Sequence, residues 1–260
     1  MDLQLKGKVV LVTGGAKGIG AAIVRTSAAE GAIPVFLDRD VEAAQKLLPA
    51  LQNLGATSEF IPGDITAPQT CAATVERTLQ KFGRLDALVN NVGANDNVSL
   101  AHGTVDKFLA SLQLNLVHYY AMAHEALPAL KKARGAIVNI SSKTAVTGQG
   151  GTSGYVAAKA AILGLTREWA AELLPHGIRV NAVVPAEVDT PLYQQWISGF
   201  PNADEKLARI VSKIPLGKRM TRPEEIADMV VVLLSERASH ITGQHVYVDA
   251  GYTHLDRALT

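Results

Sequence analysis

The chain has 260 residues and a formal net charge of +1; 48% of its residues are hydrophobic and 19% are charged. This composition can supply the core of one large α/β domain, and the small charge without basic clusters argues against nucleic-acid or anionic-membrane partners. No apolar run approaches the ~20 residues of a membrane helix, and the single cysteine, Cys71, excludes an internal disulfide and predicts a cytoplasmic protein.

The first predicted element is a buried strand at residues 8–13 that runs directly into a glycine-rich turn. Its residues are apolar and mostly β-branched, as in a strand covered on both faces. Gly14, Gly18 and Gly20 allow a tight turn and a close approach of the backbone to a phosphate. The helix predicted at residues 21–30 would offer free N–H groups at its N-terminus. We therefore predict a dinucleotide site at this turn.

The second predicted strand, residues 33–37, ends at Asp38. A carboxylate about 20 residues beyond the glycines can accept hydrogen bonds from both ribose hydroxyls of an adenosine. Because Asp38 would also repel a 2′-phosphate, it predicts NAD as the cofactor rather than NADP. Arg39 opposes this preference, since an arginine here can pair with that phosphate. The alternative for Asp38 is an N-cap of the following helix.

The rest of the chain continues this alternation of strands and helices, without repeats or linkers. Further strands are predicted near residues 58–62, 86–90, 135–141, 178–184 and 244–248, and long helices at 104–130 and 152–174. Such alternation predicts a parallel sheet covered on both faces within a single domain, residues 1–260. Residues 186–222 form a long insertion, which we expect to cover the substrate site. A capping box with Thr221 and Glu224 should open the last helix.

Tyr155 and Lys159 are the most informative pair in the chain. Four residues apart on one helix, their side chains share a face. A neighbouring ammonium favours the ionised phenol, so we expect the pKa of Tyr155 to fall from ~10 toward neutral pH, where it would serve as a base. Taken alone, this spacing is common by chance on a solvated helix face.

Five motifs in order resemble the short-chain dehydrogenase/reductase family over essentially the whole chain. They are Thr-Gly-x-x-x-Gly-x-Gly at 13–20, Asn-Asn-Val-Gly at 90–93, Asn115, Ser142 and the Tyr155–Lys159 pair. Val92 departs from the alanine usual in the family. The resemblance implies a Rossmann-type doubly wound parallel sheet of seven strands, in the order 3-2-1-4-5-6-7. It also implies a homotetramer formed through the two long helices, and no metal.

The resemblance also assigns the catalytic residues. Tyr155 would be the base, Ser142 would hold the substrate oxygen, and Lys159 would bind the nicotinamide ribose and favour the phenolate. Asn115 would hold a water that links Lys159 to solvent, although a buried asparagine satisfied by neighbours is an alternative. The predicted cofactor contacts are Gly14, Lys17, Gly18, Ile19, Gly20, Asp38, Arg39, Asp64, Ile65, Asn91, Gly93, Tyr155, Lys159, Pro185, Val188 and Thr190.

The predicted substrate end is polar. Glu187 stands where the family usually has an uncharged residue, and a carboxylate there suits a polyol better than a steroid or an acyl chain. Its alternative is an ion pair with a nearby Lys143 or an arginine. Tyr193 and Trp196 could stack on the apolar face of a sugar. The predicted substrate contacts are Asn95, Ser142, Lys143, Gln149, Tyr155, Glu187, Tyr193 and Trp196.

Three segments, residues 141–150, 185–193 and 251–259, resemble the bacterial L-fucose dehydrogenases of this family. Those enzymes oxidise the anomeric hydroxyl of an aldose to a lactone, so we expect a sugar substrate and an NAD-dependent sugar 1-dehydrogenase. One alternative is a 3-oxoacyl thioester or hydroxysteroid reductase of the same family. An alternative of another class is a non-catalytic dinucleotide-sensing regulator. Asp38 and Glu187 argue against the reductase, and the complete catalytic set argues against the regulator.

Overall fold

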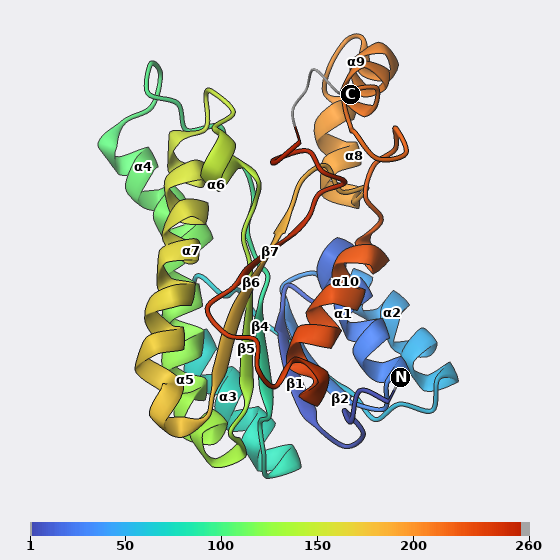
Figure 1. Ribbon diagram of the computed structural model, residues 1–260, viewed down its shortest axis with the longest axis vertical. Coiled ribbons are helices and arrows are strands. Elements are labelled where there is room, and N and C mark those ends of the chain that lie inside the picture. Colours follow the sequence, from blue (N-terminus) through green and yellow to red (C-terminus); the bar gives the residue numbers. More distant parts are fainter. Residues whose placement is uncertain (1, 256–260) are drawn as a thin grey trace.

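Seven parallel strands form one sheet in the computed structural model, which describes residues 2–255 (Figure 1). The strand order is β3-β2-β1-β4-β5-β6-β7, as the family resemblance implies. The strands are β1 (Val9–Thr13), β2 (Ile33–Asp38), β3 (Glu59–Pro62), β4 (Ala87–Asn90), β5 (Ala136–Ile140), β6 (Arg179–Pro185) and β7 (His245–Val248). The prediction of a Rossmann-like α/β fold is confirmed.

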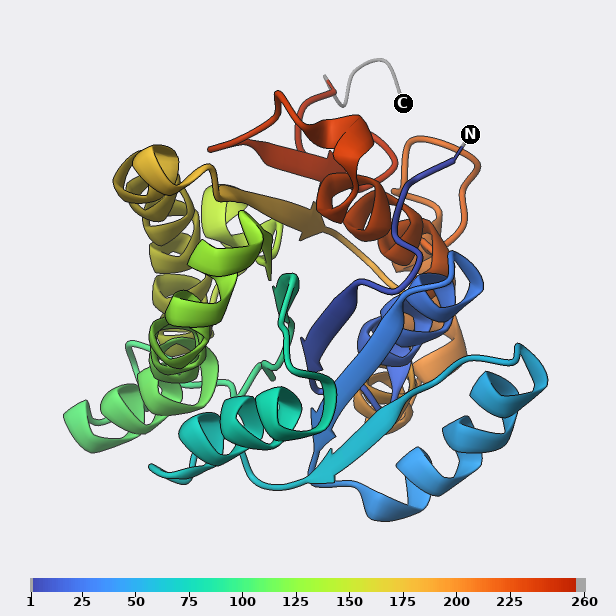
Figure 2. The same ribbon diagram turned by 90° about the horizontal axis from the view of Figure 1, so that it is seen from below.

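Helices cover both faces of the sheet (Figures 1 and 2). On one side lie α1 (Gly18–Ala29), α2 (Val41–Asn53) and α10 (Pro223–Leu234). On the other lie α3 (Thr70–Phe82), α5 (His118–Ala133) and α7 (Ser153–Leu173), with α4 (Val105–Leu112) and α6 (Thr144–Thr147) above them in Figure 1. No helix of residues 2–255 is long and apolar enough to cross a membrane.

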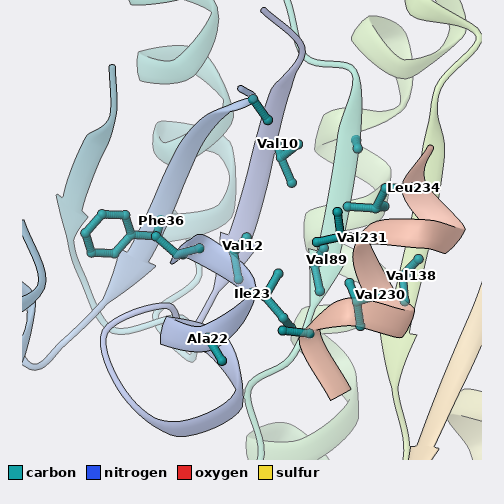
Figure 3. Packing of buried hydrophobic residues seen from close by; sticks show 14 of the residues in the cluster. Val10, Val12, Ala22, Ile23, Phe36, Val89, Val138, Val230, Val231 and Leu234 are labelled. Atoms are coloured by element: carbon teal, nitrogen blue, oxygen red, sulfur yellow. The ribbon is translucent and has the colours of Figure 1, made fainter. Parts of the chain in front are cut away.

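The sheet residues alternate between two cores, one under each layer of helices. Val10 and Val12 of β1 pack with α1 and α10, as Figure 3 shows, whereas Val9 and Leu11 face α3 and α5. All four of these side chains are fully buried. Burial on both faces explains why the strand sequence is apolar throughout instead of alternating.

The predicted single helix at 104–130 is wrong in one respect. The structure divides it into α4, a π-helical segment (Gln113–Val117) and α5. The π segment inserts one wide turn, which lets the helix axis continue while Asn115 is placed against the end of β4. Helical periodicity cannot reveal such a turn, and π turns concentrate at functional sites.

The insertion at 186–222 contains α8 (Pro191–Ser198) and α9 (Ala203–Val211), which stand above the carboxyl ends of the strands (Figure 1). Its two ends are tied together, because Thr221 donates to the carbonyl of Glu187 and Asp189 donates to the carbonyl of Thr221, both at 2.9 Å. The capping box that follows is shifted by one residue from the prediction. The Glu225 side chain, not that of Glu224, accepts from the backbone N–H of Arg222 at 2.8 Å.

Candidate active site

A cavity of about 890 Å³ opens at the carboxyl ends of the strands. All the predicted cofactor contacts line it except Gly20, as do Ser142 and Tyr193 from the substrate set. A second cavity of about 950 Å³, at the opposite end of the sheet, includes none of the predicted site residues. The residues therefore converge where ligands bind in open parallel sheets.

The glycine-rich turn is closely packed from below. A Cβ on Gly20 would lie 2.0 Å from the carbonyl oxygen of Gly14, and a Cβ on Gly14 would lie 2.8 Å from Cγ2 of Val92. Asn91 donates its amide to the carbonyls of Thr13 at 3.0 Å and Gly14 at 3.2 Å. The turn is thus held in place from one side and lines the cavity on the other, which fits a bound pyrophosphate.

Asp38 is fixed at the edge of the same cavity. Its carboxylate accepts from the backbone N–H groups of Ala16 at 3.0 Å and Asp40 at 2.9 Å. The N-cap of α2 is Asp40, which accepts from the N–H of Ala43, so the capping alternative for Asp38 is wrong. Arg39 is exposed and lines the cavity. With the glycine turn, this carboxylate completes a cradle that fits the adenosine half of a nicotinamide dinucleotide.

Lys159 lies at the floor of the cavity with 2% of its surface exposed. Its ammonium donates to the hydroxyl of Tyr119 at 3.0 Å and to the carbonyl of Ile140 at 2.9 Å. A Cβ on Gly93 would lie 3.0 Å from Nζ, so a larger residue there would crowd the lysine. Burial lowers the pKa of Lys159 to about 7.

Tyr155 stands one helical turn before Lys159 on α7, and Ser142 follows β5. The expected lowering of its pKa by Lys159 is not what the structure gives. Burial raises the pKa of Tyr155, a hydrogen bond from Ser142 opposes that rise, and the charge of Glu187 adds to it. The lysine points to Tyr119 and Ile140, with Nζ 5.7 Å from the centre of the Tyr155 ring.

Asn115 is fully buried within the π segment. Its side chain accepts from the N–H of Ala94 at 2.8 Å and donates to the carbonyl of Ser111 at 3.1 Å. Both ends of the amide therefore have protein partners, as the alternative interpretation expects. Its oxygen also lies 3.1 Å from the place of a Cβ on Gly93, so Asn115 borders the lysine site, and its water-binding role stays a prediction.

At the substrate end, Glu187 forms an ion pair with Lys143, and both side chains are largely buried. The pairing alternative is therefore the one that the structure gives. The hydroxyl of Tyr193 hydrogen-bonds to Glu187, and the ammonium of Lys143 lies 3.7 Å from the centre of the Tyr252 ring. The pair sits behind Ser142 and Tyr193 and does not line the cavity itself.

The other predicted substrate residues lie farther out. Asn95 and Gln149 are exposed in loops and do not line the cavity. Trp196 packs edge-on between Tyr193 and Phe200 on the outer part of α8. Residues 256–259, the end of the third sugar-dehydrogenase-like segment, lie outside the described residues.

Two residues of the site were not predicted, Tyr119 and Tyr252. Tyr119 lies one helical turn after Asn115 and therefore on the same side of its helix, the only sequence signal that could have found it. Within residues 2–255 no three His, Cys, Asp or Glu side chains group into a possible metal site.

The comparisons with known proteins agree with this geometry. Residues 14–253 match the family model described as enoyl-(acyl carrier protein) reductase. The chain is 40% identical to L-fucose dehydrogenase of Mus musculus, over 95% of this chain and 89% of that protein. It is 35% identical to a 3-oxoacyl-acyl-carrier-protein reductase of Thermotoga maritima, over 96% and 99%. The crystal structure of Cj0485 dehydrogenase superposes with a TM-score of 0.96 at 46% identity, covering 100% and 99% of the two chains.

Proposed function

Because the chain belongs to the short-chain dehydrogenase/reductase family, whose members are NAD(P)-dependent oxidoreductases, we propose that it is an NAD-dependent sugar 1-dehydrogenase. The substrate would be an aldose such as L-fucose, oxidised at its anomeric carbon to the lactone. The observation that carries this proposal is the polar wall that the hydroxyl groups of Ser142 and Tyr193 form in the cavity beside Tyr155, with the Tyr193 hydroxyl held by Glu187. Similarity to L-fucose dehydrogenases supports it further.

Each reacting residue has one task in this proposal. Ser142 orients the anomeric hydroxyl, and Tyr155, ionised to the phenolate, takes the proton of that hydroxyl on its oxygen. Lys159 supplies the positive charge that favours the phenolate. A nicotinamide dinucleotide, held by the glycine turn and Asp38, would supply the hydride acceptor.

A polar wall is unfavourable for a long apolar substrate. Burying an unpaired hydroxyl group against an acyl chain or a steroid costs about 1–3 kcal/mol. Hydroxyl groups of a sugar, by contrast, can hydrogen-bond to Tyr193 and Ser142, which line the cavity. The hydroxyl groups on the cavity wall therefore favour a polyol as the substrate.

The second candidate is a 3-oxoacyl thioester reductase, favoured by the similarity to the Thermotoga maritima enzyme and by the description of the family model. The two candidates separate in one experiment. Purified protein is assayed by cofactor absorbance against a panel of aldoses with NAD or NADP, and against a β-keto thioester with NADH or NADPH. Oxidation of L-fucose or a related aldose is expected. Ready thioester reduction without any aldose oxidation would replace the sugar proposal by the reductase.

We also propose that the protein is a homotetramer. Leu109, Val117 and Tyr120, on α4, the π segment and α5, expose 56%, 42% and 58% of their surface. Apolar side chains along a helix that already packs on the sheet indicate a further partner. Light scattering at micromolar concentration should give the mass of four chains; a monomer would contradict the proposal.

A further inference from the structure

The ammonium of Lys159 is held by only two groups in the described residues. One is the carbonyl oxygen of Ile140, at the end of β5, and the other is the hydroxyl of Tyr119, on α5. No carboxylate forms an ion pair or a hydrogen bond with it in the described part of the chain. An ammonium with so few partners in a buried place is strongly penalised, so each partner counts.

The direction of the bond between Tyr119 and Lys159 is fixed by the neighbouring bond. The Tyr119 hydroxyl donates its one hydrogen to the carbonyl of Ile140, at 2.9 Å. Its lone pair is left for the lysine, so the hydroxyl can only accept. Tyr119 is completely buried, and its ring packs in the core between its own helix, α5, and the sheet. The hydroxyl is therefore held in place from both ends and presents a fixed acceptor to Lys159.

We propose that Tyr119 is a positioning residue for the reaction: its hydroxyl accepts a hydrogen bond from Lys159 and holds the ammonium, in its charged form, beside Gly93 and Asn115. This role concerns the proton chemistry of the family and does not depend on which alcohol is oxidised. The ammonium has three N–H groups. Two are taken by Tyr119 and Ile140, which leaves one for the cavity.

The other titratable groups around Lys159 do not supply this partner. His118 precedes Tyr119, and its ring lies 4.9 Å from the Tyr119 ring. Burial lowers the pKa of His118 to about 4, so the ring is neutral near pH 7. The Nε2 atom of the ring hydrogen-bonds to the carbonyl of Leu114 at 2.9 Å. Burial raises the pKa of Tyr155, on α7, and the hydrogen bonds of the Lys159 ammonium go to Tyr119 and Ile140 instead. Tyr119 is thus the one side-chain acceptor on the ammonium among the described residues.

The test replaces this acceptor without changing the ring. In Tyr119→Phe the charged form of Lys159 loses a hydrogen bond, so its pKa should fall by about one to two units. The pKa is measured in the free protein from the chemical shift of ¹³Cε-labelled lysine, with Lys159→Met identifying the resonance. In steady-state assays of alcohol oxidation, the alkaline limb of kcat/KM should move to lower pH by a similar amount. The loss of activity should therefore be larger at high pH than at low pH.

The neighbouring tyrosine provides the control. Tyr120, 58% exposed on the same helix, makes no contact with Lys159, so Tyr120→Phe should leave both readouts unchanged. If Tyr119→Phe fails to fold, 3-fluorotyrosine at position 119 keeps the shape and weakens the acceptor, and it should give a smaller shift in the same direction. A Tyr119→Phe protein, or a fluorotyrosine protein, with the wild-type lysine pKa and pH profile would overturn the proposal and leave Tyr119 as a packing residue only. Failure of the aldose assay alone would not affect it.

Discussion

Replacing Glu187 by glutamine should weaken the fold as well as the reaction, because the Glu187 carboxylate is already committed to Lys143. The two side chains keep only 16% and 11% of their surface exposed. Removing one partner of a buried pair costs about 3–5 kcal/mol. Glutamine retains an acceptor for the Tyr193 hydroxyl, so we expect the free energy of unfolding to fall by about 2–3 kcal/mol. This loss corresponds to a fall in Tm of roughly 5–10 °C.

A double-mutant cycle shows whether the pair itself carries this cost. Lys143→Met with Glu187→Gln removes both charges, so the double variant should be more stable than the sum of the two single changes by about 2 kcal/mol. Chemical denaturation of the four proteins measures this coupling. Strict additivity would refute the reasoning, because it would mean that the two groups do not interact in solution.

The same substitution has a kinetic consequence. The charge of Glu187 contributes to the raised pKa of Tyr155, so its removal should lower that pKa. The acid limb of kcat/KM for alcohol oxidation should then move to lower pH in Glu187→Gln. A movement to higher pH would show that Glu187 does not act on Tyr155 in this way.

Three further predictions follow from the site. Tyr155→Phe should reduce kcat by orders of magnitude while NAD binding, measured by calorimetry, stays nearly intact; more than about a tenth of wild-type kcat would contradict the assignment. The wild type should prefer NAD over NADP by about tenfold or more, because like charges at ~4 Å repel by about 1–4 kcal/mol. Asp38→Ser should narrow or reverse this preference. Equal kcat/KM values for the two cofactors in the wild type would contradict the expectation. Lys159→Met should raise Tm by several degrees at pH 6, since the folded state holds a lysine whose pKa is lowered to about 7 from 10.5. Below pH 7 the wild type bears the full penalty of the buried charge, and the penalty disappears as pH rises from 7 to 10.5, so an advantage of the variant that grows with pH would contradict this sign.

The strands and the catalytic helix could be predicted from the sequence because local patterns determine them. The apolar run at 9–12 and the Tyr155–Lys159 spacing need no knowledge of distant residues. Their partners could not be predicted in the same way. Lys159 meets Tyr119 from 40 residues away, and the sequence offered the pairing of Glu187 with Lys143, 44 residues apart, only as an alternative. Only the order of strands and the packing of α5 against α7 bring these groups together.

Two local predictions failed for a different reason. The π segment around Asn115 satisfies the same helix-forming pattern as an α-helix, so periodicity does not distinguish them. The pKa of Tyr155 was predicted from its neighbour in sequence, whereas burial and Glu187 set its direction in the fold. In both cases the outcome depends on contacts with several other elements of the fold, which the local sequence does not contain.

The two hydrogen bonds between residues 187–189 and Thr221 hold the two ends of the insertion side by side. The chain leaves the sheet after β6 and enters α10 next to the same point, where Val188 and Thr221 form a short parallel bridge. The length of the segment between these points therefore does not affect how β6 pairs with β7. The start of the segment lines the cavity, and the N–H of Leu216 donates to the carbonyl of Ala250 at 3.1 Å, so an exchange that keeps the dinucleotide cradle in place must lie between these contacts. For a protein engineer, residues 196–213, which lie beyond the cavity-lining part of α8, are therefore the natural unit of recombination: grafts from other members of the family can be screened for new alcohols without rebuilding the catalytic floor.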